Sequence, residues 1–214
     1  MVLIAAAIAL STSNGFAAGS VCPSGGTPAP GSHVHGGLEV NGVCILNGVI
    51  VGGGVEIANG GHLQLQSSTL NGGLVVDPGG ELDINAVTSG NGTPTLTSST
   101  VNGRTTGNNL DDVDIWTAKL NGGIALNGAS HFPTICGSDF KGASSFSNFS
   151  NPAQIGGGFV SGFPCGGNTF HGTVILTNLT TFMGGNTIDG NLLCSNSSVI
   201  VTAPNTITGT NTCY

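Results

Sequence analysis

The chain has 214 residues, of which 38 are Gly and only 6% are charged, and its formal net charge at pH 7 is −7. Three basic residues against ten acidic ones argue against nucleic acid as a partner, because phosphate binding needs clustered Lys and Arg. Gly shows no period of three, which excludes collagen. The chain also lacks the low hydrophobicity and high net charge of a disordered protein.

The first segment has the pattern of a signal peptide. An apolar run, Val2–Leu10, is followed by small and polar residues up to Ala18. The run is too short to span a bilayer, and it is typical of the apolar part of a signal peptide, although the usual positive segment before it is missing. We therefore predict a signal peptide over residues 1–18 and a single domain over residues 19–214, located outside the cell or at its surface, without membrane insertion.

An internal repeat begins near Cys44. The segment GGGVEIANGGH at residues 52–62 aligns without a gap on NGGLVVDPGGE at residues 71–81. In the same way, STVNG at residue 99 aligns on AKLNG at residue 118. Toward the C-terminus, NTFHG, NTIDG and NTITG begin at residues 168, 186 and 205. The period is about 19 residues, close to the range of solenoid folds.

The repeat predicts an all-β fold, a right-handed parallel β-helix with coils of about 19 residues. Short apolar or alternating runs suit strands, and Gly and Asn between them supply the positive φ of tight corners. A single coil cannot bury its apolar face, but a stack of coils can. The LxxLxL pattern of leucine-rich repeats is absent. We expect Val51, Leu70, Val101 and Leu120 to stack in one inward column.

Two intervals are longer than the repeat. One lies between Leu70 and Val101, and the other lies between Phe140 and Phe170. Both exceed a single period by more than half its length. Each interval contains either an insertion or a coil that has lost its sequence signature.

One polar column follows from the same register. It consists of the residues eleven positions after each corner: His62, Glu81, Asp112 and His131. Imidazole and carboxylate groups bind divalent cations when they converge, and a further coil could separate Glu81 from Asp112. Corners of a solenoid also accept polar residues that bind no ligand. The isolated pair His33 and His35 lies in a segment rich in Gly and Pro, and it too is expected to bind none. We therefore assign no metal ligand and no cofactor.

Three carboxylates lie close together at Asp111, Asp112 and Asp114, with Arg104 and Lys119 nearby in the sequence. Polysaccharide lyases and glycosidases built on parallel β-helices use paired or clustered Asp together with basic residues. Three basic residues in the whole chain are too few for a clamp on an acidic sugar. We expect no catalytic residues and no enzymatic activity.

The six cysteines suggest a framework of three disulfides in an oxidising compartment. They are Cys22, Cys44, Cys136, Cys165, Cys194 and Cys213. Cys194 and Cys213 are one period apart, so they should stack on adjacent coils within reach of a disulfide. We predict Cys22–Cys44 and Cys136–Cys165 as the remaining pairs, although spacing alone does not decide among the possible connectivities.

The last coils carry a family resemblance. The segment GNLLCSN…PNTITGTNTC, residues 190–213, resembles a repeat of secreted bacterial right-handed parallel β-helix proteins of unassigned function. In these proteins GNLxC is followed one coil later by NTxxGxxxxC. The resemblance implies this fold and an extracellular setting, and it implies no catalytic residues.

Two functional hypotheses follow, and a third is less favoured. The first is a secreted structural or adhesive solenoid that assembles end to end with itself into a filament or matrix, because the terminal coils lack the charged or Pro-rich blocks that protect exposed strand edges. The second is a polysaccharide-active or carbohydrate-binding β-helix, which would need a groove lined by Asp, Arg and aromatic residues. One Trp and one Tyr, Trp116 and Tyr214, make a poor stacking platform. Ice binding would need regular Thr ladders, and the candidates Thr173, Thr177, Thr180 and Thr181 are irregular.

Overall fold

The computed structural model describes residues 20–22, 27–85, 98–160 and 163–214. The predicted signal peptide, residues 1–18, lies outside these ranges. The described residues form 28 strands and no helix, so the all-β prediction is confirmed. Accordingly, no described helix is long and apolar enough to cross a membrane.

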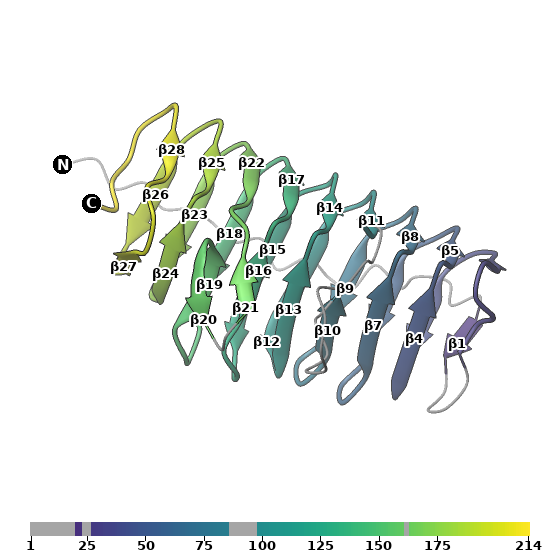
Figure 1. The fold of residues 1–214 in the computed structure, drawn as a ribbon. Coiled ribbons are helices and arrows are strands. Elements are labelled where there is room, and N and C mark those ends of the chain that lie inside the picture. The colour runs from purple at the N-terminus through teal and green to yellow at the C-terminus, as the bar shows by residue number, and fades with distance from the viewer. Residues whose placement is uncertain (1–19, 23–26, 86–97, 161–162) are drawn as a thin grey trace, which may run out of the picture.

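Three parallel sheets, named A, B and C here, form the walls of a β-solenoid (Figure 1). Sheet A contains β1 (Ser20–Cys22), β3 (Leu38–Val40), β6 (Val55–Ile57), β9 (Leu74–Val76), β12 (Thr105–Leu110), β15 (Ile124–Ala129), β18 (Ser144–Ser147), β23 (Val174–Thr177) and β26 (Leu192–Ser195). Sheet B contains β2 (His33–Val34), β5 (Ile50–Val51), β8 (Thr69–Leu70), β11 (Thr100–Val101), β14 (Lys119–Leu120), β17 (Asp139–Lys141), β22 (Thr169–His171), β25 (Thr187–Ile188) and β28 (Thr206–Ile207). Sheet C contains β4 (Val43–Asn47), β7 (His62–Gln66), β10 (Glu81–Ile84), β13 (Asp112–Trp116), β16 (Thr134–Cys136), β19 (Ala153–Gly156), β24 (Thr180–Gly184) and β27 (Ser198–Val201).

The predicted inward column is confirmed. Val51 pairs with Leu70, Leu70 with Val101, and Val101 with Leu120, and none of the four is more than 1% exposed. The column continues through Phe140 and Phe170, whose rings stack with centroids 4.8 Å apart. Each coil therefore buries its apolar face against the coils before and after it.

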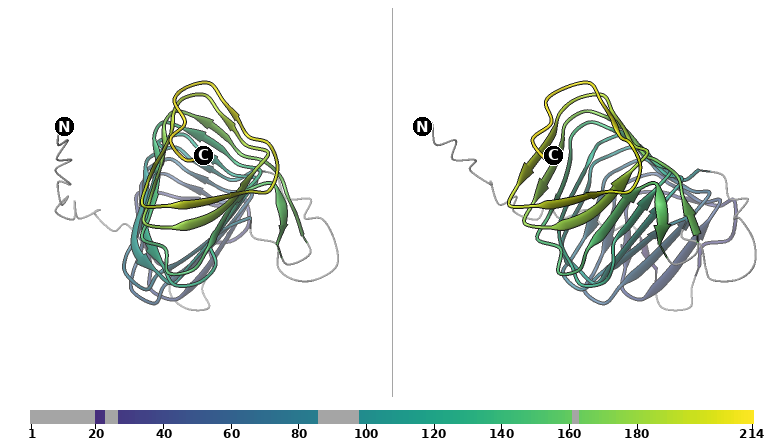
Figure 2. Two further views of the ribbon diagram at one scale, coloured as in Figure 1. Left: turned by 90° about the vertical axis from the view of Figure 1, so that its left-hand side faces the viewer. Right: turned by 60° about the vertical axis from the view of Figure 1, so that its left-hand side comes forward.

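Both long intervals contain insertions rather than additional coils. Strand β8 pairs directly with β11, and β17 pairs directly with β22. The second insertion includes an antiparallel hairpin of β20 (Gly158–Val160) and β21 (Phe163–Cys165). Figure 2 shows that this hairpin projects from the side of the stacked coils.

All three predicted disulfides are present. They are Cys22–Cys44, Cys136–Cys165 and Cys194–Cys213, with Cα–Cα distances of 5.8, 5.2 and 5.0 Å. Cys194 and Cys213 occupy equivalent positions on adjacent coils, because Leu192 pairs with Asn211. Cys165 joins the base of the hairpin to β16.

A ladder of polar side chains, most of them buried, lines the turn that leads from sheet C into sheet B. Its members, called the inner ladder, are Ser68, Ser99, Ser138, Asn168, Asn186 and Asn205. Each of them accepts a hydrogen bond from the backbone N–H of the equivalent residue one coil earlier. Thus Asn168 N–H donates to Asn186 Oδ1 at 2.9 Å, and Asn186 N–H donates to Asn205 Oδ1 at 3.0 Å. The inner ladder explains the Asn of the NTxxG repeats, because a buried backbone N–H needs an acceptor.

Glycine is required at the corner from sheet B into sheet A. A Cβ atom on Gly72, Gly103 or Gly122 would lie less than 3 Å from backbone atoms of the preceding coil. The Gly of the Asn-Gly corner motif therefore permits the close stacking of successive coils.

Candidate functional site

The outer face of sheet C carries a cluster of ionisable groups on three adjacent strands. Alternate residues of a strand point outward, and the strands pair in register so that equivalent side chains become neighbours. We call the following group the acidic face: His62 and Gln64 on β7, Glu81 and Asp83 on β10, and Asp112 and Asp114 on β13. Each of these side chains is partly exposed.

The predicted polar column is formed at three of its four positions. His62 pairs with Glu81, and Glu81 pairs directly with Asp112. No further coil separates Glu81 from Asp112, so the carboxylates of adjacent strands are immediate neighbours.

The prediction for the fourth member of the column, His131, is wrong. Thr134 pairs with Asp114, which places Phe132 rather than His131 in line with Asp112. The coil that leads to β16 has one residue more than the repeat, and this residue shifts His131 out of the column. His131 instead faces Asp111, with 3.4 Å between its Nδ1 and the Asp111 Oδ1.

The imidazole of His62 lies between two carboxylates. Its Nε2 is 2.8 Å from Asp83 Oδ2, and its Nδ1 is 3.4 Å from Glu81 Oε2. The hydrogen bond with Asp83 is the main reason that the pKa of His62 is raised. Burial raises the pKa of Glu81. The raised pKa favours the protonated form of His62, whose positive charge offsets part of the negative charge of the acidic face.

Among the described residues, neither carboxylate on β13 forms an ion pair. Burial raises the pKa of Asp112. Burial, followed by the charge of Asp112, raises the pKa of Asp114 to about 7. Asp114 is therefore partly protonated at neutral pH.

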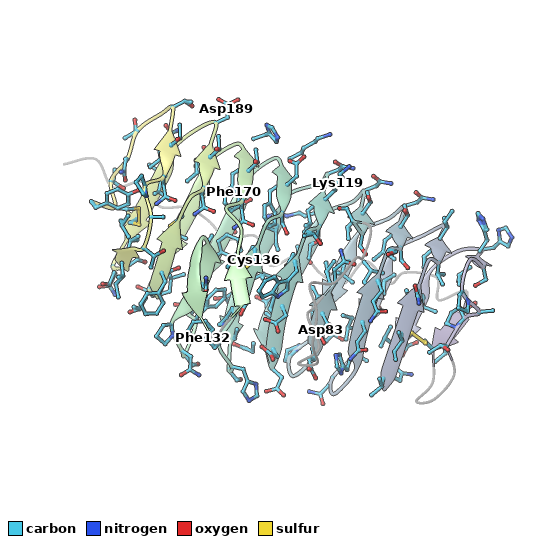
Figure 3. The ribbon with its side chains drawn as sticks, viewed as in Figure 1. Asp83, Lys119, Phe132, Cys136, Phe170 and Asp189 are labelled. Atoms are coloured by element: carbon cyan, nitrogen blue, oxygen red, sulfur yellow. A yellow bond between two sulfur atoms is a disulfide. The ribbon has the colours of Figure 1, made fainter. Side chains whose placement is uncertain are left out.

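The basic residues considered with these carboxylates lie elsewhere. Arg104 is in the turn before β12 of sheet A, and Lys119 is on β14 of sheet B. Figure 3 shows Lys119 at the edge formed by sheet B, away from Asp83. The four ion pairs found among the described residues all use histidine. The acidic face therefore has no basic clamp within the described part of the chain.

Aromatic side chains also lie on sheet C. Trp116 is half-buried at the end of β13, and the rings of Phe132 and Phe182 stack with centroids 6.5 Å apart. Tyr214 lies in the C-terminal tail and is 57% exposed. Trp116 and Tyr214 therefore do not combine into one platform.

The Thr candidates for ice binding are dispersed. Thr177 is on sheet A, whereas Thr180 and Thr181 are on sheet C, where Thr181 is buried. The sequence reasoning missed an outward Thr column on sheet B, which pairs Thr69 with Thr100 and, further on, Thr169 with Thr187 and Thr206. Lys119 and Asp139 interrupt this column, so it forms no continuous Thr face.

The sequence reasoning also missed Asp83. A signal for it exists, because the segments HLQ, ELD and DVD occupy equivalent places at residues 62, 81 and 112. Two polar residues separated by one apolar residue share the outer face of a strand. Among the described residues, His62, Glu81 and Asp83 form a group of three potential metal ligands. The exposed His33 and His35 take no part in it.

The chain matches none of the family models, curated proteins or solved structures with which it was compared. The resemblance of the tail to secreted β-helix repeat proteins therefore stays a prediction. The fold itself defines the class, a parallel β-solenoid with three disulfides and an acidic patch on one sheet. All six cysteines are paired, which indicates an oxidising, extracellular type of environment.

Proposed function

We propose that this protein is a secreted structural or adhesive solenoid that associates with further copies of itself through its last coil. The observation that carries the proposal is an uncovered core at that coil. Val201 occupies an inward position paired with Met183, which is 0% exposed, yet Val201 is 44% exposed. Val199 and Ile207, also inward, are only partly buried.

Two strand edges accompany this uncovered core. Strands β27 and β28 are the last strands of sheets C and B in the described residues. The tail covers part of sheet A instead, because Asn211 bridges to Leu192 and Cys213 is bonded to Cys194. Free edges of this kind pair readily with another chain. A contact between the last coil of one copy and the first coil of the next does not close, and its repetition gives a filament.

The setting of the proposal is extracellular. The predicted signal peptide and the disulfides support secretion. The low content of charged residues, 6%, suits a protein that packs against copies of itself.

The test compares the secreted protein with two lysine variants by light scattering over a range of concentrations and by negative-stain electron microscopy. Val201→Lys should keep the protein monomeric, because it places a charge on the uncovered core. Ile175→Lys is the matched control, since Ile175 is 38% exposed on the outer face of β23. A wild-type protein that stays monomeric at high concentration contradicts the proposal, as does an equal effect of both variants. Circular dichroism checks the fold of each variant.

A second candidate is the binding of an extracellular polysaccharide by the outer face of sheet C. Trp116 stands two residues from Asp114 on the same strand face, and sugars bind through aromatic stacking and hydrogen bonds to carboxylates. Retention on insoluble polysaccharides should then fall in Trp116→Ala. Reducing-sugar release in the same assay is expected to be absent. Release that is lost in Asp112→Asn would identify an enzyme instead.

A further inference from the structure

We propose that His62, Glu81 and Asp83 form a binding site for a divalent transition-metal ion of the zinc class. This site is independent of the proposed self-association. One potential donor atom from each of the three residues lies within 4.8 Å of the other two. The donors come from the neighbouring strands β7 and β10, which are hydrogen-bonded over four residue pairs. The backbone that presents them is therefore already in place.

The distances fit an ion held by His62 and one of the two carboxylates, because the carboxylates flank opposite nitrogens of the ring. Zinc–nitrogen and zinc–oxygen bonds of about 2.0–2.2 Å in tetrahedral geometry place two ligand atoms roughly 3.3 Å apart. His62 Nδ1 and Glu81 Oε2 are 3.4 Å apart, and His62 Nε2 and Asp83 Oδ2 are 2.8 Å apart. Whichever nitrogen binds the ion, the other retains a carboxylate as its hydrogen-bond acceptor. Such an acceptor orients a metal-binding histidine.

The surroundings favour a cation. Asp112 and Asp114 lie on the adjacent strand β13, in register with Glu81 and Asp83. No ion pair among the described residues brings Lys or Arg to these four carboxylates. His62 and Asp83 are also well enclosed, with side-chain exposures of 18% and 16%. A divalent ion would balance this negative charge.

The donor set selects the class of ion. Imidazole favours zinc and similar transition metals, whereas calcium takes oxygen ligands only. Zinc binds the deprotonated imidazole, so it competes with protons for His62 and its binding is linked to proton release. This release separates a site that uses His62 from a loose association with carboxylates.

The test is isothermal titration of the untagged, EDTA-treated protein with zinc chloride at pH 7. Titrations in two buffers of different ionisation enthalpy report proton release. We expect one zinc ion per chain, proton release, and a rise in the unfolding temperature, since the ion binds the native state. His62→Gln and Asp83→Asn should each weaken binding by roughly tenfold or more.

Matched controls come from the other histidines. His171 pairs with the single carboxylate Asp139 at 3.0 Å, so His171→Gln should bind zinc as the wild type does. The double variant His33→Gln, His35→Gln should do the same. Unfolding midpoints measured in EDTA show whether each variant is folded. If His62→Gln is unfolded, Asp83→Asn provides the test of the site.

Four results would overturn the assignment. They are the absence of zinc binding, binding unchanged in both His62→Gln and Asp83→Asn, binding lost in either control, and binding of calcium alone without proton release.

Discussion

The inner ladder predicts that Asn186→Ala is far more destabilising than a typical substitution of a polar residue. Asn186 is 1% exposed. Its Oδ1 accepts hydrogen bonds from Asn168 N–H and Asn168 Nδ2 at 2.9 and 3.1 Å. Its Nδ2 donates to Ile155 O and Asn205 Oδ1 at 2.8 and 2.9 Å. Alanine removes all four bonds and leaves Asn168 N–H without that acceptor.

The magnitude follows from these partners. A buried polar group that loses its hydrogen-bond partner costs about 1–3 kcal/mol, and two or three such groups are affected. We therefore expect a loss of about 3–5 kcal/mol in the free energy of unfolding, a large part of the usual stability of a domain.

Asn102→Ala is the control for this prediction. Asn102 also belongs to an asparagine ladder, with bonds to Asn71 at 3.1 Å and from Asn121 at 2.8 Å, but these side chains are exposed. Water can replace their bonds, so the expected loss is within about 0.5 kcal/mol. Urea unfolding followed by circular dichroism, with the disulfides intact, measures both variants. Hydrogen exchange locates the change, because repeat proteins can unfold in parts. Equal losses in both variants would refute the reasoning.

Two further predictions concern charge and cross-linking. The pKa of Asp114 is about 7 in the fold against an ordinary value of 3.8. The native state thus binds this proton more tightly than the unfolded state, and stability should fall as pH rises from about 4 to about 7. In Asp114→Asn, the urea midpoint measured in EDTA should fall less as pH rises than it does in the wild type. An unchanged dependence of the midpoint on pH would contradict this prediction. Replacing Cys194 and Cys213 by Ser opens a loop with a sequence separation of 19 and should cost roughly 3 kcal/mol. In this double Ser variant, hydrogen exchange should show a loss of protection in β28. Full protection of β28 would contradict the prediction.

The acidic face shows where sequence reasoning stops. The repeat spacing correctly placed His62 next to Glu81 in the column, but it misplaced His131 by one residue. A single additional residue before β16 is invisible to a fixed period, yet it changes which side chain faces Asp112. Asp83 was missed because its importance depends on the position of the His62 ring, and only the packed structure determines that position.

The sequence by itself determined the coil length, the inward column from Val51 to Leu120 and the placement of Cys194 one period before Cys213. These features are periodic, and in a parallel solenoid residues one period apart become neighbours in space. The tertiary structure alone decided that the intervals after Leu70 and Phe140 contain insertions, and that one imidazole meets two carboxylates on sheet C. The physical reason is that an interval well over one period long fits either an added coil or a loop, and strand hydrogen bonding chooses between them. The directions of side chains across neighbouring strands are likewise settled only when the coils stack.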